Sequence, residues 1–153
     1  MGILTEEMKQ AIPAIRLSFV ATVSPDGKPN LSAKGSLCVW DDDHLLFADI
    51  ASPQTMKNLS SNPYVEINTV DQIGRRGFRF KGVAEILREG EVFTFLADDI
   101  HAREGAGVPV HAAVKVRVLE ARPLLSPAYF LVKGITEAEV RAMDGALRIS
   151  PHQ

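Results

Sequence analysis

Apolar and polar residues alternate with a period of two in several segments of this chain, the pattern typical of half-buried β-strands. Together with the shorter apolar runs, this alternation predicts six strands, at residues 17–23, 30–40, 45–49, 64–70, 78–87 and 111–120. The turn between the first two strands contains Pro25, which presets φ, and Gly27, which tolerates positive φ. A second turn at residues 41–44 leads into the third strand. The first three strands are therefore predicted to form an antiparallel β-meander.

Four short segments carry helix signals between and after these strands. Thr5 is a predicted N-cap, and Pro13 is expected to end or bend the helix that follows. Ser52 and Pro53 predict the start of a second helix that ends at residues 62–63. A third helix is expected at residues 91–101, before a glycine-rich loop at residues 103–109. A capping box at residues 136–139 predicts a last helix that reaches about residue 147.

Strands and helices do not alternate regularly enough for a doubly wound sheet. A small antiparallel β-barrel with short helices is the better solution, because closure of the barrel removes exposed strand edges. The fold class is thus mainly β. We expect a single domain over residues 1–153, with a helical C-terminal tail from about residue 123.

Composition narrows the range of functions. The 153 residues are 46% hydrophobic and carry a net charge of −2, which argues against a nucleic-acid or membrane-surface partner. One cysteine excludes an intramolecular disulfide, and the four histidines are too scattered for a metal site. The N-terminus does not resemble a secretory signal, and no apolar run approaches the ~18 residues of a membrane span. We expect a cytoplasmic protein.

The strand at residues 30–40 carries the first candidate site. Lys34 and Ser36 share one face of it, so a cation lies next to a hydroxyl. One interpretation is a solvated outer face, and the other is contact with a phosphate or a ribityl chain. The interpretation as a phosphate contact gains support if the meander places this strand beside residues 45–49. These residues lead to the helix that starts at Ser52. Free N–H groups and the helix dipole make such a start a ready anion site.

Two further groups could take part. Thr55, Lys57 and Asn58 lie in the first turns of the second helix, either as ordinary capping and surface residues or as contacts to a phosphate and its neighbouring polar groups. Arg75 and Arg76 lie between two strands, either at a solvated hairpin tip or near the N1–C2=O edge of a flavin. A guanidinium there would stabilise the anion formed on reduction.

In order and spacing, these segments resemble the pyridoxamine 5'-phosphate oxidase-like FMN-binding family over about residues 15–88. The segments that carry the resemblance are FVATVSPDGKP at 19–29, SAKGS at 32–36, DD at 41–42, LFAD at 46–49, TMKNL at 55–59, NP at 62–63 and FKGVAEI at 80–86.

The resemblance implies a split β-barrel homodimer with FMN at the subunit interface. By position it makes Lys34, Ser36, Thr55, Lys57 and Asn58 candidates for the phosphate site. Backbone near Ala48 and Asp49 would lie along the isoalloxazine, and Arg76 is a further candidate.

The chain also departs from the family pattern. True oxidases of this family carry a C-terminal tryptophan and an Arg/His substrate clamp, whereas Trp40 is the one tryptophan here and residues 123–153 show no clamp. Oxidation of pyridoxamine 5'-phosphate is therefore not expected. The family also contains flavin reductase-like, deazaflavin-dependent and haem-binding proteins. The resemblance implies an FMN-dependent oxidoreductase that uses a reduced nicotinamide and an unknown acceptor, or alternatively a non-catalytic flavin or haem carrier or sensor.

Overall fold

The computed structural model describes the main chain of residues 2–148 and the side chains of residues 2–144. Its strands are β1 (Ser18–Val23), β2 (Pro29–Lys34), β3 (Cys38–Val39), β4 (His44–Asp49), β5 (Tyr64–Asp71), β6 (Arg76–Leu87) and β7 (Ala112–Leu125). Its helices are α1 (Glu6–Ile15), α2 (Pro53–Ser61), α3 (Glu91–Glu104), α4 (Ala128–Leu131) and α5 (Glu137–Arg148).

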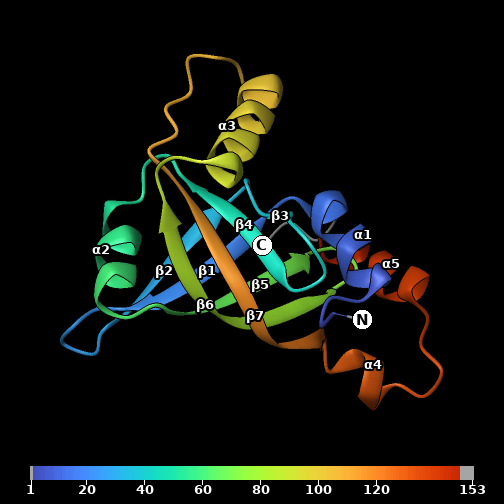
Figure 1. Ribbon diagram of the computed structural model, residues 1–153. Helices are drawn as coiled ribbons and strands as arrows, with labels where there is room; N and C mark the ends of the chain where they lie inside the picture. The colour runs from blue at the N-terminus through green and yellow to red at the C-terminus, as the bar shows by residue number, and fades with distance from the viewer. Residues whose placement is uncertain (1, 149–153) are drawn as a thin grey trace.

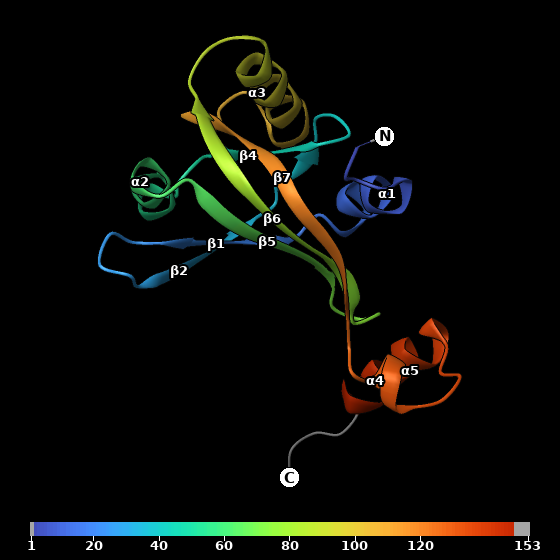
Figure 2. The same ribbon diagram turned by 60° about the horizontal axis from the view of Figure 1, so that its bottom comes forward.

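The strands form one curled antiparallel sheet in the order β2-β1-β5-β6-β7-β4-β3. The long strands β6 and β7 coil across its middle, while α2 and α3 lie at one end and α1 lies on the other side of β4 (Figures 1 and 2). The predicted antiparallel barrel class is confirmed as a split barrel, because β2 and β3 form two edges that do not pair with each other.

The prediction of a single strand at residues 30–40 is wrong. This segment forms two strands, β2 and β3, which lie at opposite edges of the sheet. β2 pairs with β1, from Ser18 opposite Lys34 to Val23 opposite Pro29, whereas β3 pairs with β4. The three-stranded meander is therefore not formed. Residues 35–37 instead cross from one edge of the curled sheet to the other, which brings the end of β2 close to β4.

Strand β4 is buried on both faces, which explains its unbroken apolar run. Leu45 and Phe47 belong to the core inside the barrel, together with Val20, Ile67 and Phe80. On the opposite face, residues of β4 and β7 pack against α3 in a second core that contains Leu46, Ala48, Leu96, Ile100 and Ala113. This second core fixes α3 beside the part of β4 that bears the candidate site.

The predicted turns and caps of the first half are largely confirmed. Gly27 has φ of 81° in the β1–β2 turn, a conformation that favours glycine. Thr5 caps α1 by accepting a hydrogen bond from Met8 N at 3.3 Å. Pro13 does not end this helix, which continues to Ile15. Pro13 has no N–H to donate, so the last turn of α1 lacks the hydrogen bond that another residue would make at this position.

The C-terminal segment projects beyond the end of the sheet as α4 and α5 (Figure 2). β7 reaches Leu125, so the helical tail begins later than residue 123. The capping box is confirmed, since Glu139 Oε2 accepts from Thr136 N at 2.7 Å and Thr136 Oγ1 accepts from Glu139 N at 3.3 Å. The predicted tail residues 149–153 lie outside the described residues. No helix between residues 2 and 148 combines the length and the apolarity that crossing a membrane requires.

Candidate anion and cofactor site

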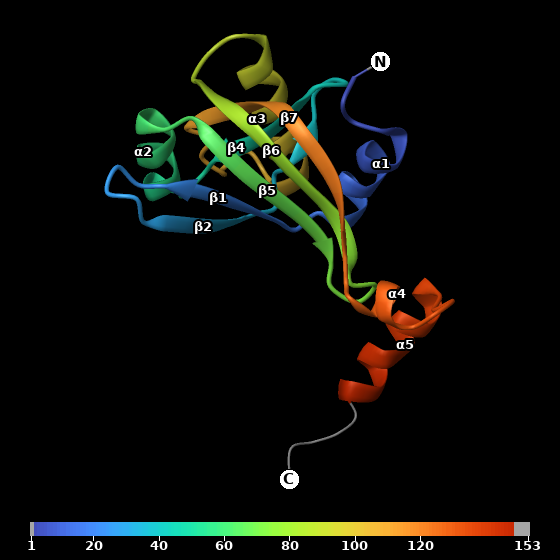
Figure 3. The same cartoon turned by 90° about the horizontal axis from the view of Figure 1, so that it is seen from below.

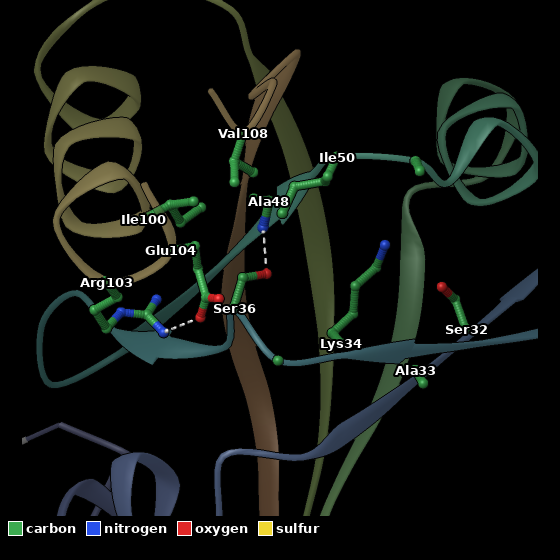
Figure 4. A pocket seen from close by; sticks show the side chains of 12 residues that line it. Ser32, Ala33, Lys34, Ser36, Ala48, Ile50, Ile100, Arg103, Glu104 and Val108 are labelled. Carbon is green, nitrogen blue, oxygen red and sulfur yellow. Dashed lines mark hydrogen bonds and ion pairs between the residues drawn. The ribbon is translucent and has the colours of Figure 1, made fainter. Parts of the chain in front are cut away.

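A pocket of about 420 Å3 lies between the β2 end of the sheet, the end of β4 and helix α3 (Figure 4). Its lining residues come from three parts of the chain that are distant in sequence. They are Ser32, Ala33, Lys34, Gly35, Ser36, Ala48, Ile50, Ala51, Ile100, Arg103, Glu104 and Val108.

Lys34 is the last residue of β2, and the residue is only 7% exposed. Its Nζ donates a hydrogen bond to Ser52 Oγ at 2.5 Å and lies 5.8 Å from the ring centroid of Phe47. Burial lowers the pKa of Lys34, and the negative charge of Asp49 opposes this shift. Within the described residues no carboxylate lies within ion-pair distance of Nζ. The buried ammonium has three N–H donors but, in the part of the chain that the structure describes, only one acceptor, which is neutral. A bound anion would supply the missing acceptors and the opposite charge.

Ser36 lies in the segment that crosses from β2 to β3. Its Oγ accepts a hydrogen bond from Ala48 N at 3.0 Å, and this bond links the crossing segment to β4 (Figure 4). The Ser36 hydroxyl keeps its own O–H to donate. The structure thus brings Lys34, Ser36 and Ala48 to one pocket, as the sequence predicts, although β2 and β4 are not paired strands.

Ser52 precedes α2 as predicted, but its side chain does not cap the helix. Ser52 Oγ instead donates to Asp49 Oδ1 at 3.1 Å and accepts from Lys34 Nζ, while Ser52 N donates to the same Asp49 oxygen at 3.2 Å. The first turn of α2 therefore receives no side-chain hydrogen bond from its N-cap. Asp49, another predicted site residue, has the role of an acceptor that orients Ser52.

The three predicted residues of α2 have different environments. Asn58 is fully buried, donates from Nδ2 to Thr22 Oγ1 at 3.0 Å and accepts from Gln54 Nε2 at 2.7 Å. Thr55 is also buried and accepts from Asn30 Nδ2 at 3.3 Å. Lys57 is exposed. None of the three lines the pocket, and the contacts of Thr55 and Asn58 hold α2 against β1 and β2.

Arg76 is not brought to this pocket. It begins β6 at the far end of the sheet, where its guanidinium pairs with Glu7 at 2.8 Å and with Glu137 at 3.2 Å. These ion pairs link α1, β6 and α5. The neighbouring Arg75 lies in the β5–β6 turn with φ of 52°.

Helix α3 supplies lining residues that the sequence did not point to: Ile100, Arg103, Glu104 and, in the loop after it, Val108. Their helical spacing alone looks like an ordinary amphipathic surface. The one sequence feature that pointed to this side of the pocket was the predicted glycine-rich loop after α3. His101 of α3 contacts this loop, with its Nε2 lying 2.9 Å from the Val108 carbonyl oxygen.

Cys38 lies in β3 beside α3. Burial raises the pKa of its thiol to about 11, with a further rise from the charge of Asp99 and an opposing effect of Arg103. It is therefore an inert thiol at neutral pH. Among the described residues, no group of three or more histidine, cysteine, aspartate or glutamate side chains could hold a metal ion.

Comparison with known proteins agrees with this fold. The family model described as pyridoxamine 5'-phosphate oxidase matches residues 4–129. The uncharacterized protein MJ0282 of Methanocaldococcus jannaschii is 31% identical over 125 residues, which is 80% of this chain and 82% of that protein.

Solved structures give the same result. HupZ of Group A Streptococcus is 35% identical, with a TM-score of 0.72 over 80% of this chain and 95% of HupZ. An FMN-binding protein from Syntrophomonas wolfei subsp. wolfei has a TM-score of 0.69 at 16% identity, over 76% of this chain and 84% of that protein. HutZ, the heme storage protein from Vibrio cholerae, has a TM-score of 0.63 at 18% identity, over 82% and 95% of the two chains. The likeness to the last two shows the fold alone.

The match of the family model covers most of the chain, including every residue that lines the pocket. The chain belongs to the pyridoxamine 5'-phosphate oxidase family.

Proposed function

We propose that this protein binds FMN in the pocket between β2, β4 and α3, with the phosphate at Lys34 and the start of α2. The observation that carries the proposal is the buried Lys34 ammonium, whose one hydrogen bond within the described residues goes to the neutral hydroxyl of Ser52. A phosphate would supply the negative charge and the acceptors that this ammonium lacks.

The other residues of the pocket fit the same ligand. Ser32 and Ser36 add hydroxyl donors, and the first turn of α2 adds the positive end of a helix dipole. Each charge-assisted hydrogen bond is worth ~1.5–3 kcal/mol, and the helix end adds ~0.3–1 kcal/mol. Apolar side chains suited to a planar ring line the rest of the pocket: Ala48, Ile50, Ile100 and Val108.

We propose an oxidoreductase activity for the loaded protein, with a reduced nicotinamide as electron donor. Bound flavin would supply the capacity to accept and pass on electrons or hydride. The role of the protein itself would be to bind and orient the flavin. Lys34 and Ser36 would hold the phosphate, and the residues of α3 would cover the opposite side of the pocket. No side chain is required as a general acid or base.

Haem is the alternative ligand in this family. Among the residues that the structure describes, the pocket lining contains no histidine, cysteine, methionine or tyrosine, the side chains that usually hold haem iron. The donors present favour a phosphate-bearing cofactor. A flavin carrier without turnover uses the same site, and kinetics distinguish it from an enzyme.

We also propose that the protein is a homodimer with FMN at the subunit interface. In support, β1, β2 and β5 lie next to one another in the sheet (Figure 3). Their outer face carries exposed large apolar residues, among them Leu31 at 67% and Tyr64 at 64% exposure. Glu66 and Asn68 interrupt this face, which also includes Phe19, Ala21 and Val70. An apolar patch of this kind is typical of an interface. A second copy of the chain is the occupant that the family resemblance implies.

The proposal is tested by adding FMN or hemin to purified protein and recording the visible spectrum after desalting. We expect retained flavin absorbance at one FMN per chain, and bleaching on anaerobic addition of a reduced nicotinamide. Retained flavin that does not bleach would mean a carrier. A colourless protein after FMN addition, or retention of hemin instead, would overturn the flavin assignment.

A further inference from the structure

The proposed phosphate site leaves two charged residues of the pocket without a role. Arg103 and Glu104 end helix α3 and line the pocket on the side opposite Lys34, with Ser36 and Ala48 between them (Figure 4). A ligand anchored at Lys34 and long enough to fill the pocket extends toward these two side chains.

Arg103 is oriented by the helix that carries it. Its Nη2 and Nε donate to one oxygen of Asp99, at 2.8 and 3.1 Å, one turn earlier in α3. Its Nη1 lies 3.8 Å from Glu104 Oε1, and the side chain is 31% exposed. The guanidinium has five N–H donors, so several remain for an acceptor in the pocket. Its position is thus fixed before a ligand arrives.

We infer that Arg103 and Glu104 set the reduction potential of the flavin, with opposite signs; the inference rests on the proposed function. Reduction of a flavin ring by two electrons and one proton, here from a reduced nicotinamide, leaves one negative charge on the ring at neutral pH. A cation near that charge stabilises the reduced form and raises the potential, and an anion lowers it. Sequence reasoning gives this task to Arg75 or Arg76, but Arg103 is the arginine that lines the pocket.

The experiment compares the reduction potential of bound FMN in wild-type protein, Arg103→Gln and Glu104→Gln, measured against a reference dye during anaerobic reduction. For Arg103→Gln we expect reduced FMN to bind three- to tenfold more weakly relative to oxidised FMN. This is a potential lower by about 15–30 mV, at 29.6 mV per tenfold change for a two-electron couple. Glu104→Gln should move the potential upward.

Two variants serve as controls. Arg103→Lys keeps the charge and should hold the potential near the wild-type value. Arg122→Gln removes an exposed arginine of β7 that pairs with Glu120 and does not line the pocket, and it should change nothing. Dissociation constants for oxidised FMN should stay within about threefold in all four variants, which shows that each still folds and binds.

The outcomes separate the two proposals. Wild-type protein that retains no FMN overturns the proposed function and this inference with it. A second outcome overturns the inference alone. In it, wild-type protein binds FMN, but the potentials of Arg103→Gln and Glu104→Gln equal the potential of Arg122→Gln or shift in the same direction.

Discussion

The ammonium of Lys34 lies 2.5 Å from the hydroxyl of Ser52, and that hydroxyl in turn donates to Asp49. This chain of hydrogen bonds connects the last residue of β2 to the start of α2 through the end of β4. It holds a buried positive charge in place without neutralising it by direct pairing. Such an arrangement costs stability in the free protein and favours binding of an anion, because part of the desolvation of the lysine ammonium has already occurred on folding.

Replacement of Lys34 by methionine should therefore separate stability from binding. Methionine keeps most of the side-chain volume and removes the buried charge, so the free energy of unfolding of the cofactor-free protein should stay equal or rise. FMN should bind about 10- to 100-fold more weakly, the scale of one charged hydrogen bond. Urea denaturation and a fluorescence titration measure the two quantities. Lys28→Met, in an exposed turn, is the matched control and should affect neither.

The affinity for FMN should depend on pH on both sides of neutrality. Burial lowers the pKa of Lys34 in the free protein, and a bound phosphate would raise it again, so binding takes up a proton at alkaline pH. The affinity should fall as the pH rises through the lowered pKa of Lys34. It should also fall below about pH 6, where the phosphate loses its second charge. In Lys34→Met the alkaline decrease should vanish and the acidic decrease should remain; an unchanged alkaline decrease would assign it to another group.

Asn58 should matter for folding rather than for binding. Its amide connects Thr22 of β1 and Gln54 of α2 in a fully buried position. Asn58→Ala should lower the free energy of unfolding by ~1–3 kcal/mol, because it removes the buried hydrogen bonds to Thr22 and Gln54 that attach α2 to β1. Gln54→Ala, which removes one bond at an exposed position, should cost less. Normal stability with weakened FMN binding would instead make Asn58 a ligand contact, as the family resemblance implies.

The thiol of Cys38 should react slowly in the folded protein. With a pKa of about 11, roughly one thiol in a thousand is ionised at pH 8, against about a quarter at an ordinary cysteine pKa. Labelling with a thiol-specific reagent should be about a hundredfold slower in native protein than in urea. Asp99→Asn should speed it, because that carboxylate adds to the raised pKa. Equal rates in native and unfolded protein would contradict the burial of β3 against α3.

The fold class could be predicted from the sequence because period-two alternation and turn residues are local signals. The break at residues 35–37 could not, since alternation continues through it unchanged from Ser32 to Cys38. The break follows from the pairing of distant strands in the curled sheet, where β2 pairs with β1 at one edge and β3 pairs with β4 at the other. The predicted pairing was therefore wrong, while the shared direction of Lys34 and Ser36 was correct.

The candidate site divides in the same way. Lys34 and Ser36 were predicted from the face of the strand that they share, and Ala48 from the family resemblance. Arg103 and Glu104 were missed because their position depends on packing of α3 against β4, about 55 residues earlier in the chain. Arg76 was named from its place between two strands and from the family resemblance, but the register of β5 and β6 carries it to the far end of the sheet, where it pairs with Glu7 and Glu137.

The most direct test compares FMN with riboflavin, which has the same ring and ribityl chain but no phosphate. Fluorescence titrations of wild-type protein and Lys34→Met with both ligands give four dissociation constants. We expect wild-type protein to bind FMN at least 100-fold more tightly than riboflavin, and Lys34→Met to lose most of that preference while its riboflavin affinity stays the same. Equal affinity of wild-type protein for the two ligands, or an undiminished preference in Lys34→Met, would contradict a phosphate site at Lys34.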